Sequence, residues 1–241
     1  MLTAIVNHAC NGNAIALRRG FAAWSPVVSI DSGSNLTTEE RPWFDDCLPN
    51  VYYSGLVNRA FEHAATLADN DILLLLCSDV EVADPVQLLR RLTEAFRDPA
   101  VQLWGPCSSG SPHPHMWPKG SGGTRQVSFI EGFCFAARKS LLARVCPVDL
   151  EVNRLGWGID VLLGYHAARQ GGKSLVDDAT EVRHPITTGY GVQEARAQRN
   201  TWFGSKSPRA RRFRQLATLP GVRAGWGCQL LYRWAARGDH D

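Results

Sequence analysis

Residues 71–77, DILLLLC, contain an uninterrupted apolar run from Ile72 to Cys77, which is soon followed by two acidic residues, Asp79 and Glu81, with one valine between them. A strand that is buried on both faces reads as a continuous apolar run, because neither of its sides faces water. The run therefore predicts a central strand of a mostly parallel sheet that helices cover on both faces.

Further apolar, β-branched stretches alternate with helical patterns along the first hundred residues, which is typical of βα units. We expect strands at residues 4–6, 26–30, 51–53, 71–77, 101–104 and 127–137, and two short strands within 174–184. We expect helices at residues 14–23, 56–68, 86–96, 138–145 and 160–170. Asp84 before Pro85 is a strong start signal for the third of these helices. The sequence thus predicts an α/β fold.

Composition places the chain among globular proteins, since 44% of its 241 residues are hydrophobic and 20% are charged. No run reaches the roughly 18 to 20 apolar residues that a membrane-spanning helix needs. The first ten residues contain no basic leader, so we expect a cytoplasmic protein. Seven scattered cysteines without CxxC spacing are expected to stay reduced and argue against a structural zinc site.

Two segments stand apart from the regular pattern. Residues 105–124 are dense in Gly, Pro and Ser, and a loop of this length inside a domain is usually a lid or a binding loop. Residues 196–237 contain ten Lys and Arg and no acidic residue, with aromatic residues interleaved. Such an arm suits an anionic membrane surface or nucleic acid, and its aromatic residues equally suit packing onto the rest of the chain. A cytoplasmic protein with this arm could also dock peripherally on a membrane.

The two acids after the apolar run lie where ligands bind in open α/β sheets, just beyond the carboxyl ends of the strands. Carboxylates one residue apart can share Mg²⁺ or Mn²⁺, which prefer oxygen ligands. The alternative is that Asp79 and Glu81 are solvated acids ahead of the next helix.

A second informative stretch, LGWGIDVLLGYHAARQGG at 155–172, is followed by EVRHP at 181–185. Gly156 and Gly158 allow close backbone approach, and Asp160 falls in the first turn of the helix after them. Asp160 is there either a helix cap or a general base that accepts a proton from an attacking hydroxyl. His184 is either a buried core histidine or an imidazole ligand of the metal.

Taken together, these stretches resemble a GT-A glycosyltransferase and are most similar to the inverting family 2. The resemblance covers residues 3–190, and it rests on the order and spacing of these stretches: AIVNHACNGNAIALRRGFAAW, VVSIDSGS, NVYYSGLVNRAFEHA, LLLLCSDVEVADP, FIEGFCFAARKSLL, GWGIDVLLGYHAARQGGK and VRH. It implies a Rossmann-like, mostly parallel sheet flanked by helices over residues 1–190. Residues 1–104 would form the nucleotide-sugar half and 125–190 the acceptor half, with 191–241 as a basic, aromatic C-terminal extension.

The resemblance also implies roles for individual residues. Asp31 would contact the nucleoside, and Asp79 the ribose and the metal. Glu81 would bind the metal and the diphosphate, in a DxE motif where the family has DxD. Asp160 would be the general base, and His184 a metal or phosphate ligand.

Four more residues are candidates for substrate binding. Asn7 and Asn58 are expected on the donor side, and Glu131 and Trp157 on the acceptor side. The family usually has an acidic pair where this chain has Ile159 before Asp160. Asp160 alone must therefore do the proton work, or the assignment shifts by one residue.

The implied activity is a transfer, dependent on Mn²⁺ or Mg²⁺, of a hexose or pentose from a nucleotide-diphosphate sugar to an acceptor hydroxyl with inversion. A glycan or lipid-linked glycan is the expected acceptor. A hydroxymethylated base in DNA, as in phage DNA modification, remains an alternative acceptor because of the basic arm. A catalytically inactive nucleotide-sugar-binding module is a further alternative. A sugar nucleotidyltransferase is disfavoured, since the first loop has only Gly12 in place of a glycine-rich phosphate loop.

Overall fold

The computed structural model describes residues 1–185, 190–219, 222 and 226–237. The helices are α1 (Asn11–Ala22), α2 (Tyr52–His63), α3 (Pro85–Ala95), α4 (Lys139–Leu142), α5 (Leu150–Asn153), α6 (Ile159–Arg169), α7 (Val192–Gly204), α8 (Pro208–Ala217) and α9 (Trp226–Ala236), with short 3-10 turns η1 (Arg41–Trp43) and η2 (Ala64–Thr66). The strands are β1 (Leu2–Asn7), β2 (Val27–Ser32), β3 (Asp46–Leu48), β4 (Ile72–Cys77), β5 (Glu81–Val82), β6 (Val101–Cys107), β7 (Thr124–Gln126), β8 (Cys134–Arg138) and β9 (Lys173–Arg183).

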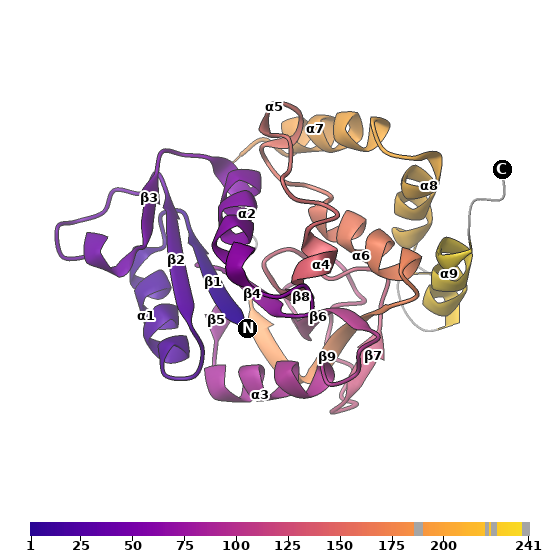
Figure 1. Cartoon of the computed structure of the whole chain (residues 1–241), viewed down its shortest axis with the longest axis horizontal. Helices are drawn as coiled ribbons and strands as arrows, with labels where there is room; N and C mark the ends of the chain where they lie inside the picture. The colour runs from indigo at the N-terminus through magenta and orange to yellow at the C-terminus, as the bar shows by residue number, and fades with distance from the viewer. Residues whose placement is uncertain (186–189, 220–221, 223–225, 238–241) are drawn as a thin grey trace.

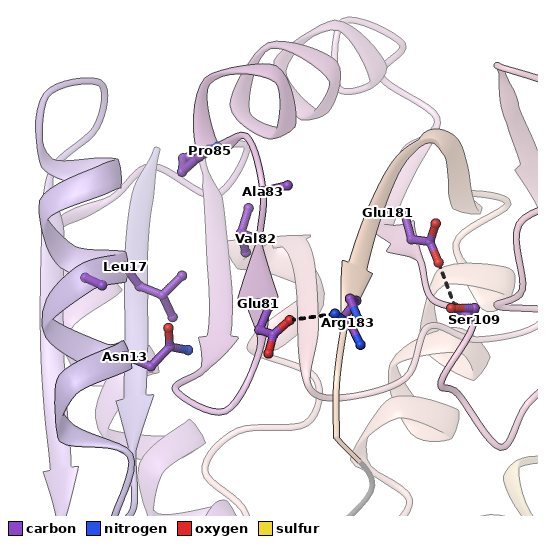
Figure 2. A pocket seen from close by; sticks show the side chains of 10 residues that line it. Asn13, Leu17, Glu81, Val82, Ala83, Pro85, Ser109, Glu181 and Arg183 are labelled. Atoms are coloured by element: carbon purple, nitrogen blue, oxygen red, sulfur yellow. Dashed lines mark hydrogen bonds and ion pairs between the residues drawn. The ribbon is translucent and has the colours of Figure 1, made fainter.

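The strands form one sheet in the order β3-β2-β1-β4-β8-β6-β9-β5, with β7 beside β9 (Figure 1). β3, β2, β1 and β4 are parallel, β8 is antiparallel to both of its neighbours, and β9 is parallel to β6. β5 pairs antiparallel with the end of β9, which sets Glu81 opposite Arg183 (Figure 2). The predicted α/β fold with a central sheet flanked by helices is confirmed, and the sheet is mixed, because β5, β7 and β8 are antiparallel to the strands beside them.

The strand directions bring distant parts of the chain to one edge of the sheet. β6 and β9 run in the same direction as β4, because β8 lies antiparallel to both β4 and β6. The carboxyl ends of β1, β4 and β9 therefore meet at the same edge as the start of β8. Asn7, Asp79, His184 and Glu131 lie at or next to these four strand ends.

β4 is buried on both faces, as its apolar run predicts. Leu73 and Leu75 pack into the apolar layer that α2 and α6 share with the sheet. Leu74 and Leu76 pack into the layer on the opposite face, with α1 and α3. All four side chains are at most 1% exposed. The core thus fixes the register of the strand whose end carries Asp79.

The strand predicted at residues 51–53 is wrong. α2 begins at Tyr52, and the strand next to β2 is the short, polar β3 instead. The side chain of Asn50 accepts a hydrogen bond from the backbone N–H of Tyr52 at 3.1 Å, and Val51 packs against Gly55 of the helix. The β-branched and aromatic residues at 51–53 therefore belong to the start of α2. The edge strand β3 could not be predicted, because it lacks an alternating apolar pattern.

Two other predicted strands have different bounds. Only Cys134–Arg138 of the segment 127–137 is a strand, because the preceding backbone bends to pack its buried residues between β6 and α6. The segment 174–184 forms the single strand β9, although its pairing with β6 is irregular between Asp177 and Glu181. The predicted break thus appears as a register shift within one strand.

The C-terminal segment folds into α7, α8 and α9, which lie along α5 and α6 (Figure 1). Trp202, Phe203, Phe213 and Tyr232 are buried in the same core as the sheet. These aromatic rings therefore pack onto the rest of the chain, so they are not available for stacking on bases or lipid headgroups. The boundary at residue 190 stays a prediction. Over the described ranges, no helix combines the length and the apolar character needed to cross a bilayer.

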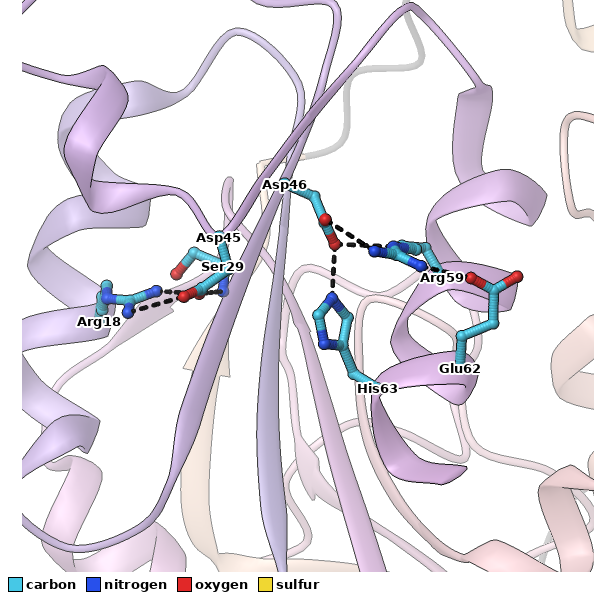
Figure 3. A network of polar contacts seen from close by, with 7 residues as sticks. All are labelled: Arg18, Ser29, Asp45, Asp46, Arg59, Glu62 and His63. Carbon is cyan, nitrogen blue, oxygen red and sulfur yellow. Dashed lines mark hydrogen bonds and ion pairs between the residues drawn. The ribbon is translucent and has the colours of Figure 1, made fainter. Parts of the chain in front are cut away.

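A polar network fastens β3 to the helices on either side of it (Figure 3). Asp46 accepts two hydrogen bonds from Arg59, at 2.8 and 2.9 Å, and one contact from His63 at 2.5 Å. The hydrogen bonds from Arg59, opposed by burial and aided by His63, lower the pKa of Asp46 to about 2. The neighbouring Asp45 pairs with Arg18 of α1. An edge strand of three residues is thereby held by charge where apolar packing is thin.

We expect Asp46→Asn to lower the free energy of unfolding by about 1 kcal/mol at pH 7, since a partly exposed ion pair with two hydrogen bonds is lost. The folded-state pKa lies below the ordinary value of 3.8, so this contribution is present above about pH 4 and is lost as the pH falls toward 2. Urea unfolding of both proteins from pH 7 down to pH 2.5 measures it. Glu62→Gln, which removes only an exposed partner of Arg59, is the control and should change stability by less than about 0.5 kcal/mol.

Candidate functional site

Asp79 and His184 meet at the carboxyl edge of the sheet. The Oδ2 atom of Asp79, just after β4, lies 3.1 Å from Nε2 of His184, just after β9. The ring of Phe133 stacks on the imidazole, with centroids 4.5 Å apart and planes 17° apart. The other carboxylate oxygen of Asp79 is buried and has no hydrogen-bond partner among the described residues. A buried anionic oxygen without a partner is costly, so this atom is arranged to receive a ligand.

The turn that carries Asp79 is held on three sides. Asn13 of α1 donates hydrogen bonds to the carbonyl oxygens of Ser78 and Val80, at 2.6 and 2.9 Å. The backbone N–H of Ser78 donates to Val6 of β1, at 2.8 Å. The backbone N–H of Cys77 donates to Phe133, also at 2.8 Å. The direction of the Asp79 side chain is therefore set by β1, α1 and the segment before β8 together.

The Asp79–His184 pair fits a divalent cation such as Mn²⁺, which accepts both carboxylate and imidazole ligands. The unpartnered carboxylate oxygen is the observation that supports the fit. Within residues 1–185, 190–219, 222 and 226–237, no three His, Cys, Asp or Glu side chains gather closely enough to hold a metal. Two protein ligands would therefore leave most coordination positions to water and to substrate oxygens.

Glu81 does not join this pair. Its side chain is 62% exposed and lies 3.5 Å from Arg183, its partner across β5 and β9. It lines a cleft of about 700 Å³ between α1, β5 and the end of β9, together with Asn13 and Leu17 (Figure 2). Glu81 also lines a smaller pocket with His184, so it borders the region of the pair, but its ion-pair partner is Arg183 and that of Asp79 is His184. The geometry favours His184 over Glu81 as the partner of Asp79.

Two carboxylic acids with raised pKa values lie across from this pair. Burial raises the pKa of Glu131 to about 7; the hydrogen bond from Ser111 opposes this, and the charge of Asp160 adds to it. Burial likewise raises the pKa of Asp160 to about 6, against a hydrogen bond from the N–H of Val161 and the charge of Arg199. His184 lies within electrostatic reach of Glu131. Both acids can therefore exchange protons near neutral pH, as general acid–base groups must.

Tyr53 joins the two segments that carry these acids. Its hydroxyl donates a hydrogen bond to the carbonyl oxygen of Gly132, next to Glu131. Its ring lies against Gly156, where a Cβ atom would collide with it. Tyr53, a residue of α2, thus contacts both the segment that carries Glu131 and the segment that carries Asp160, and it holds these two segments in place relative to each other.

Asp160 is the second residue of α6, and the N-cap is Gly158, with φ of +95°. The prediction that Asp160 lies in the first turn is confirmed, and the alternative that it is the cap is wrong. Gly158 is needed twice, since a Cβ there would lie 2.6 Å from Phe203 of α7 and the backbone is left-handed. The indole N–H of Trp157 donates to the hydroxyl of Tyr190 at 3.0 Å, so its half-buried ring is held beside the segment that leads into α7.

Asn7 and Asp31 lie together beneath the loop after β2. The amide group of Asn7 donates to Asp31 at 2.7 Å, and the backbone N–H of Ser34 donates to the other oxygen of Asp31 at 3.0 Å. Both side chains are buried. Their polar atoms are thus used to shape the loop after β2, and their contact with a nucleoside stays a prediction.

Asn58 lies on α2 and bonds to the backbone of Val148. Its amide group donates to the carbonyl oxygen of that residue at 2.8 Å, and its carbonyl oxygen accepts from the N–H at 2.7 Å. The structure therefore gives Asn58 a positioning role for the segment before α5 and does not bring it to the Asp79–His184 pair.

The long loop at 105–124 packs against the segment before β8 that carries Phe129 and Glu131. Ser111 donates its hydroxyl to Glu131 at 2.5 Å, and the indole N–H of Trp117 donates to the carbonyl oxygen of Ser111 at 2.7 Å. His115 is buried, with its Nε2 3.0 Å from the carbonyl oxygen of Phe129. The loop is thereby linked directly to one of the two acids, and its role as a lid stays a prediction.

Comparison with known proteins supplies the fold family. No protein-family model and no curated protein matches the sequence. Solved structures do match: GalNAc-T7 with UDP, GalNAc and Mn²⁺ shares 14% identity at a TM-score of 0.61, over 98% of this chain and 54% of that one. A mannosyltransferase from Pyrobaculum calidifontis in complex with GDP-Man and Mn²⁺ shares 16% identity at 0.58, over 97% and 73%. Glucosyl-3-phosphoglycerate synthase from Mycobacterium tuberculosis, with Mn²⁺, UDP-glucose and phosphoglyceric acid, shares 14% at 0.55, over 84% and 78%.

The chain has the GT-A fold. It spans about half the length of the GalNAc-T7 structure. The GT-A architecture that the sequence motifs imply is thereby confirmed. At this level of identity the likeness concerns the fold, and the chemistry has to be argued from the residues of this chain.

Sequence reasoning missed several residues that build the site. Asn13, Tyr53, Ser111 and Phe133 hold the segments of Asp79, Asp160, Glu131 and His184, respectively. Each lies far along the chain from the residue that it positions, with the exception of Ser111 and Glu131, which are twenty residues apart. A single sequence carries no signal for such pairings, since they depend on strand order.

We expect Gly158→Ala to lower the free energy of unfolding by about 2–4 kcal/mol, because it combines a left-handed backbone with a clash against Phe203. Gly204→Ala is the matched control, since a Cβ at the end of α7 meets nothing within 4 Å, and it should stay within about 1 kcal/mol of wild type. Urea unfolding measures both. Equal stability of the two variants would contradict the close contact between α6 and α7.

Proposed function

We propose that the protein is a metal-dependent glycosyltransferase that moves a sugar from a nucleotide-diphosphate donor to an acceptor hydroxyl. One arrangement carries this proposal: the Asp79–His184 pair, with its open carboxylate oxygen, faces the acids Glu131 and Asp160 at the carboxyl edge of a GT-A sheet. Solved structures of this fold contain UDP or GDP-Man together with Mn²⁺, which supports the same donor class here.

Asp79 and His184 would hold Mn²⁺ or Mg²⁺. A cation there supplies charge neutralisation for the diphosphate that leaves the sugar. The turn held by Asn13 keeps the Asp79 carboxylate in place, and the ring of Phe133 stacks on the imidazole of His184 and fixes its orientation. These two side chains thereby fix where the donor diphosphate lies, at the end of β4.

Asp160 is the proposed general base. Its pKa of about 6 leaves it ionised at neutral pH, and it is basic enough to accept the proton of the acceptor hydroxyl as this attacks the anomeric carbon. Glu131, with a pKa of about 7, is largely neutral when Asp160 is first ionised, so it can donate a hydrogen bond to the sugar or the acceptor. A single attack of this kind inverts the anomeric centre, and inversion is part of the proposal.

Trp157 would form one wall for the acceptor beside Asp160, where its ring lies between Tyr190 and Arg199. The buried aromatic residues of α7–α9 cannot stack on nucleic-acid bases or lie among lipid headgroups, so they give no support to docking on nucleic acid or on a membrane. We therefore favour an acceptor that binds from solution. An inactive nucleotide-sugar-binding module remains the rival function, and the variants below separate it from an enzyme.

We expect Asp79→Asn and His184→Ala each to reduce Mn²⁺-dependent nucleotide release from UDP-glucose, UDP-GalNAc or GDP-mannose by about 100-fold or more, since charge neutralisation by a metal is worth several kcal/mol. Glu81→Gln serves as the control, because its side chain pairs with Arg183, and it should stay within about threefold of wild type. A loss in Glu81→Gln that equals the loss in Asp79→Asn would restore the DxE assignment. No release by wild type with any donor would favour the binding module.

The pH profile tests the base. At saturating Mn²⁺ and donor, the rate of transfer should fall tenfold per pH unit below about pH 6, because protonated Asp160 cannot accept the acceptor proton. Asp160→Asn should lose at least about 100-fold of the rate. Glu131→Gln should keep the inflection near pH 6, since Glu131 is still protonated when Asp160 titrates. Disappearance of the inflection in Glu131→Gln, with activity retained in Asp160→Asn, would make Glu131 the base.

A further inference from the structure

Arg199 of α7 reaches the acceptor side from the C-terminal segment. Its aliphatic stem packs where Gly158 leaves room, 3.1 Å from the position of a Cβ atom. Its guanidinium group lies over the ring of Trp157, 5.9 Å from the centroid. The charge of Arg199 lowers the pKa of Asp160, so the two groups lie within electrostatic reach. Arg199 is therefore part of the surroundings of the proposed base, although it lies 39 residues later in the chain.

The polar groups of Arg199 are incompletely used. Its Nε atom is buried and has no hydrogen-bond partner among the described residues. One Nη atom makes a long contact of 3.4 Å with the side-chain oxygen of Asn200. Arg214 of α8 donates to that same oxygen at 2.8 Å, while its guanidinium group stacks over Phe203 at 4.9 Å. Two guanidinium groups thus converge on one neutral amide oxygen.

Among the described residues, no carboxylate forms a salt bridge with this pair of cations, and the charge of Asp160 acts on Arg199 only from a distance. Over the described ranges, neither Arg199 nor Arg214 forms an ion pair, and the neighbouring Arg196 forms none either. Burial lowers the pKa of Arg199, and the positive charge of Arg214 lowers it further, whereas Asp160 opposes the shift. Half-buried cations that repel one another cost free energy unless an anion joins them.

We propose that Arg199 and Arg214 bind an anionic group, a phosphate or a carboxylate, on the acceptor whose hydroxyl attacks the donor sugar. The inference rests on the proposed transferase function and adds the chemical class of the acceptor. A guanidinium group presents a planar fork of donors that matches both anions, and its buried Nε–H is the donor that lacks a partner here. With the anion at Arg199 and the ring of Trp157 beside it, a nearby hydroxyl comes within reach of Asp160.

In this proposal, the helices α7 and α8 position the residues that bind the acceptor. They bring basic residues of the C-terminal segment to the start of α6, and their buried aromatic residues fix that position. The segment thus acts as the acceptor-specific part of the site, and its positive charge is directed at one small anion.

Nucleotide release from the donor is measured with three added acceptors: glycerol phosphate, glyceric acid and neutral glycerol. The two anionic acceptors should accelerate release by wild type, and glycerol at the same concentration should not. Arg199→Met should raise the KM for the anionic acceptor roughly tenfold to hundredfold, as expected for a lost charge-assisted hydrogen bond, with kcat changed by less than about threefold. Release by wild type without any acceptor is measured in the same assay, so that failure of this inference can be told apart from failure of the transferase activity itself.

Arg212→Met is the matched control, because Arg212 lies on α8, is exposed and bonds only to Gln215 among the described residues. It should leave the acceptor KM at the wild-type value. Arg199→Lys should recover part of the affinity, because it restores the charge without the fork. Equal acceleration by glycerol, no acceleration by either anion, or an unchanged KM in Arg199→Met would each overturn the assignment, provided that wild type releases nucleotide. Absence of release by wild type would instead overturn the proposed function.

Discussion

The burial of β4 on both faces is the constraint on which the rest of the structure depends. Its leucines fix the strand between β1, which runs parallel to it, and β8, which runs antiparallel. The strand can end only where its apolar run ends, so Asp79 emerges at the carboxyl edge of the sheet. Because β8 is antiparallel, its start comes to the same edge and carries Glu131 and Phe133 with it. The parallel strand β9 brings His184 there from more than a hundred residues away.

The fold, and which residues lie at the candidate site, could be predicted in large part from the sequence, because they follow from local patterns. The leucine run predicts the central strand, and the Gly-Trp-Gly-Ile-Asp stretch predicts a helix that starts near Asp160. The partner of Asp79 could not be read from spacing, since Glu81 is close in sequence but lies across β5 from Arg183. The prediction of a strand at residues 51–53 was wrong because it too considered only local residue types. Tyr53 suits a strand by its residue type, but in the structure it links two distant segments.

The C-terminal segment shows how composition alone can mislead. Arginines interleaved with aromatic residues suggest a surface for nucleic acid or lipid, but the rings of Trp202, Phe203 and Phe213 are buried against the domain. What remains of the pattern is a short basic surface that ends beside Trp157 and Asp160. Once their neighbours are known, the aromatic residues of this segment are core residues, and the basic residues beside Trp157 form the anion-binding wall that we propose.

The central claim is that Asp79 and His184 form the metal centre of a nucleotide-sugar site. A crystal structure with Mn²⁺ and UDP or GDP, with the metal located by its anomalous scattering, tests it most directly. The account predicts one Mn²⁺ ion bound to the unpartnered oxygen of Asp79 and to Nε2 of His184, with diphosphate oxygens completing its coordination. Mn²⁺ bound at Glu81 and Glu181 in the neighbouring cleft, with Asp79 and His184 still paired to each other, would contradict it.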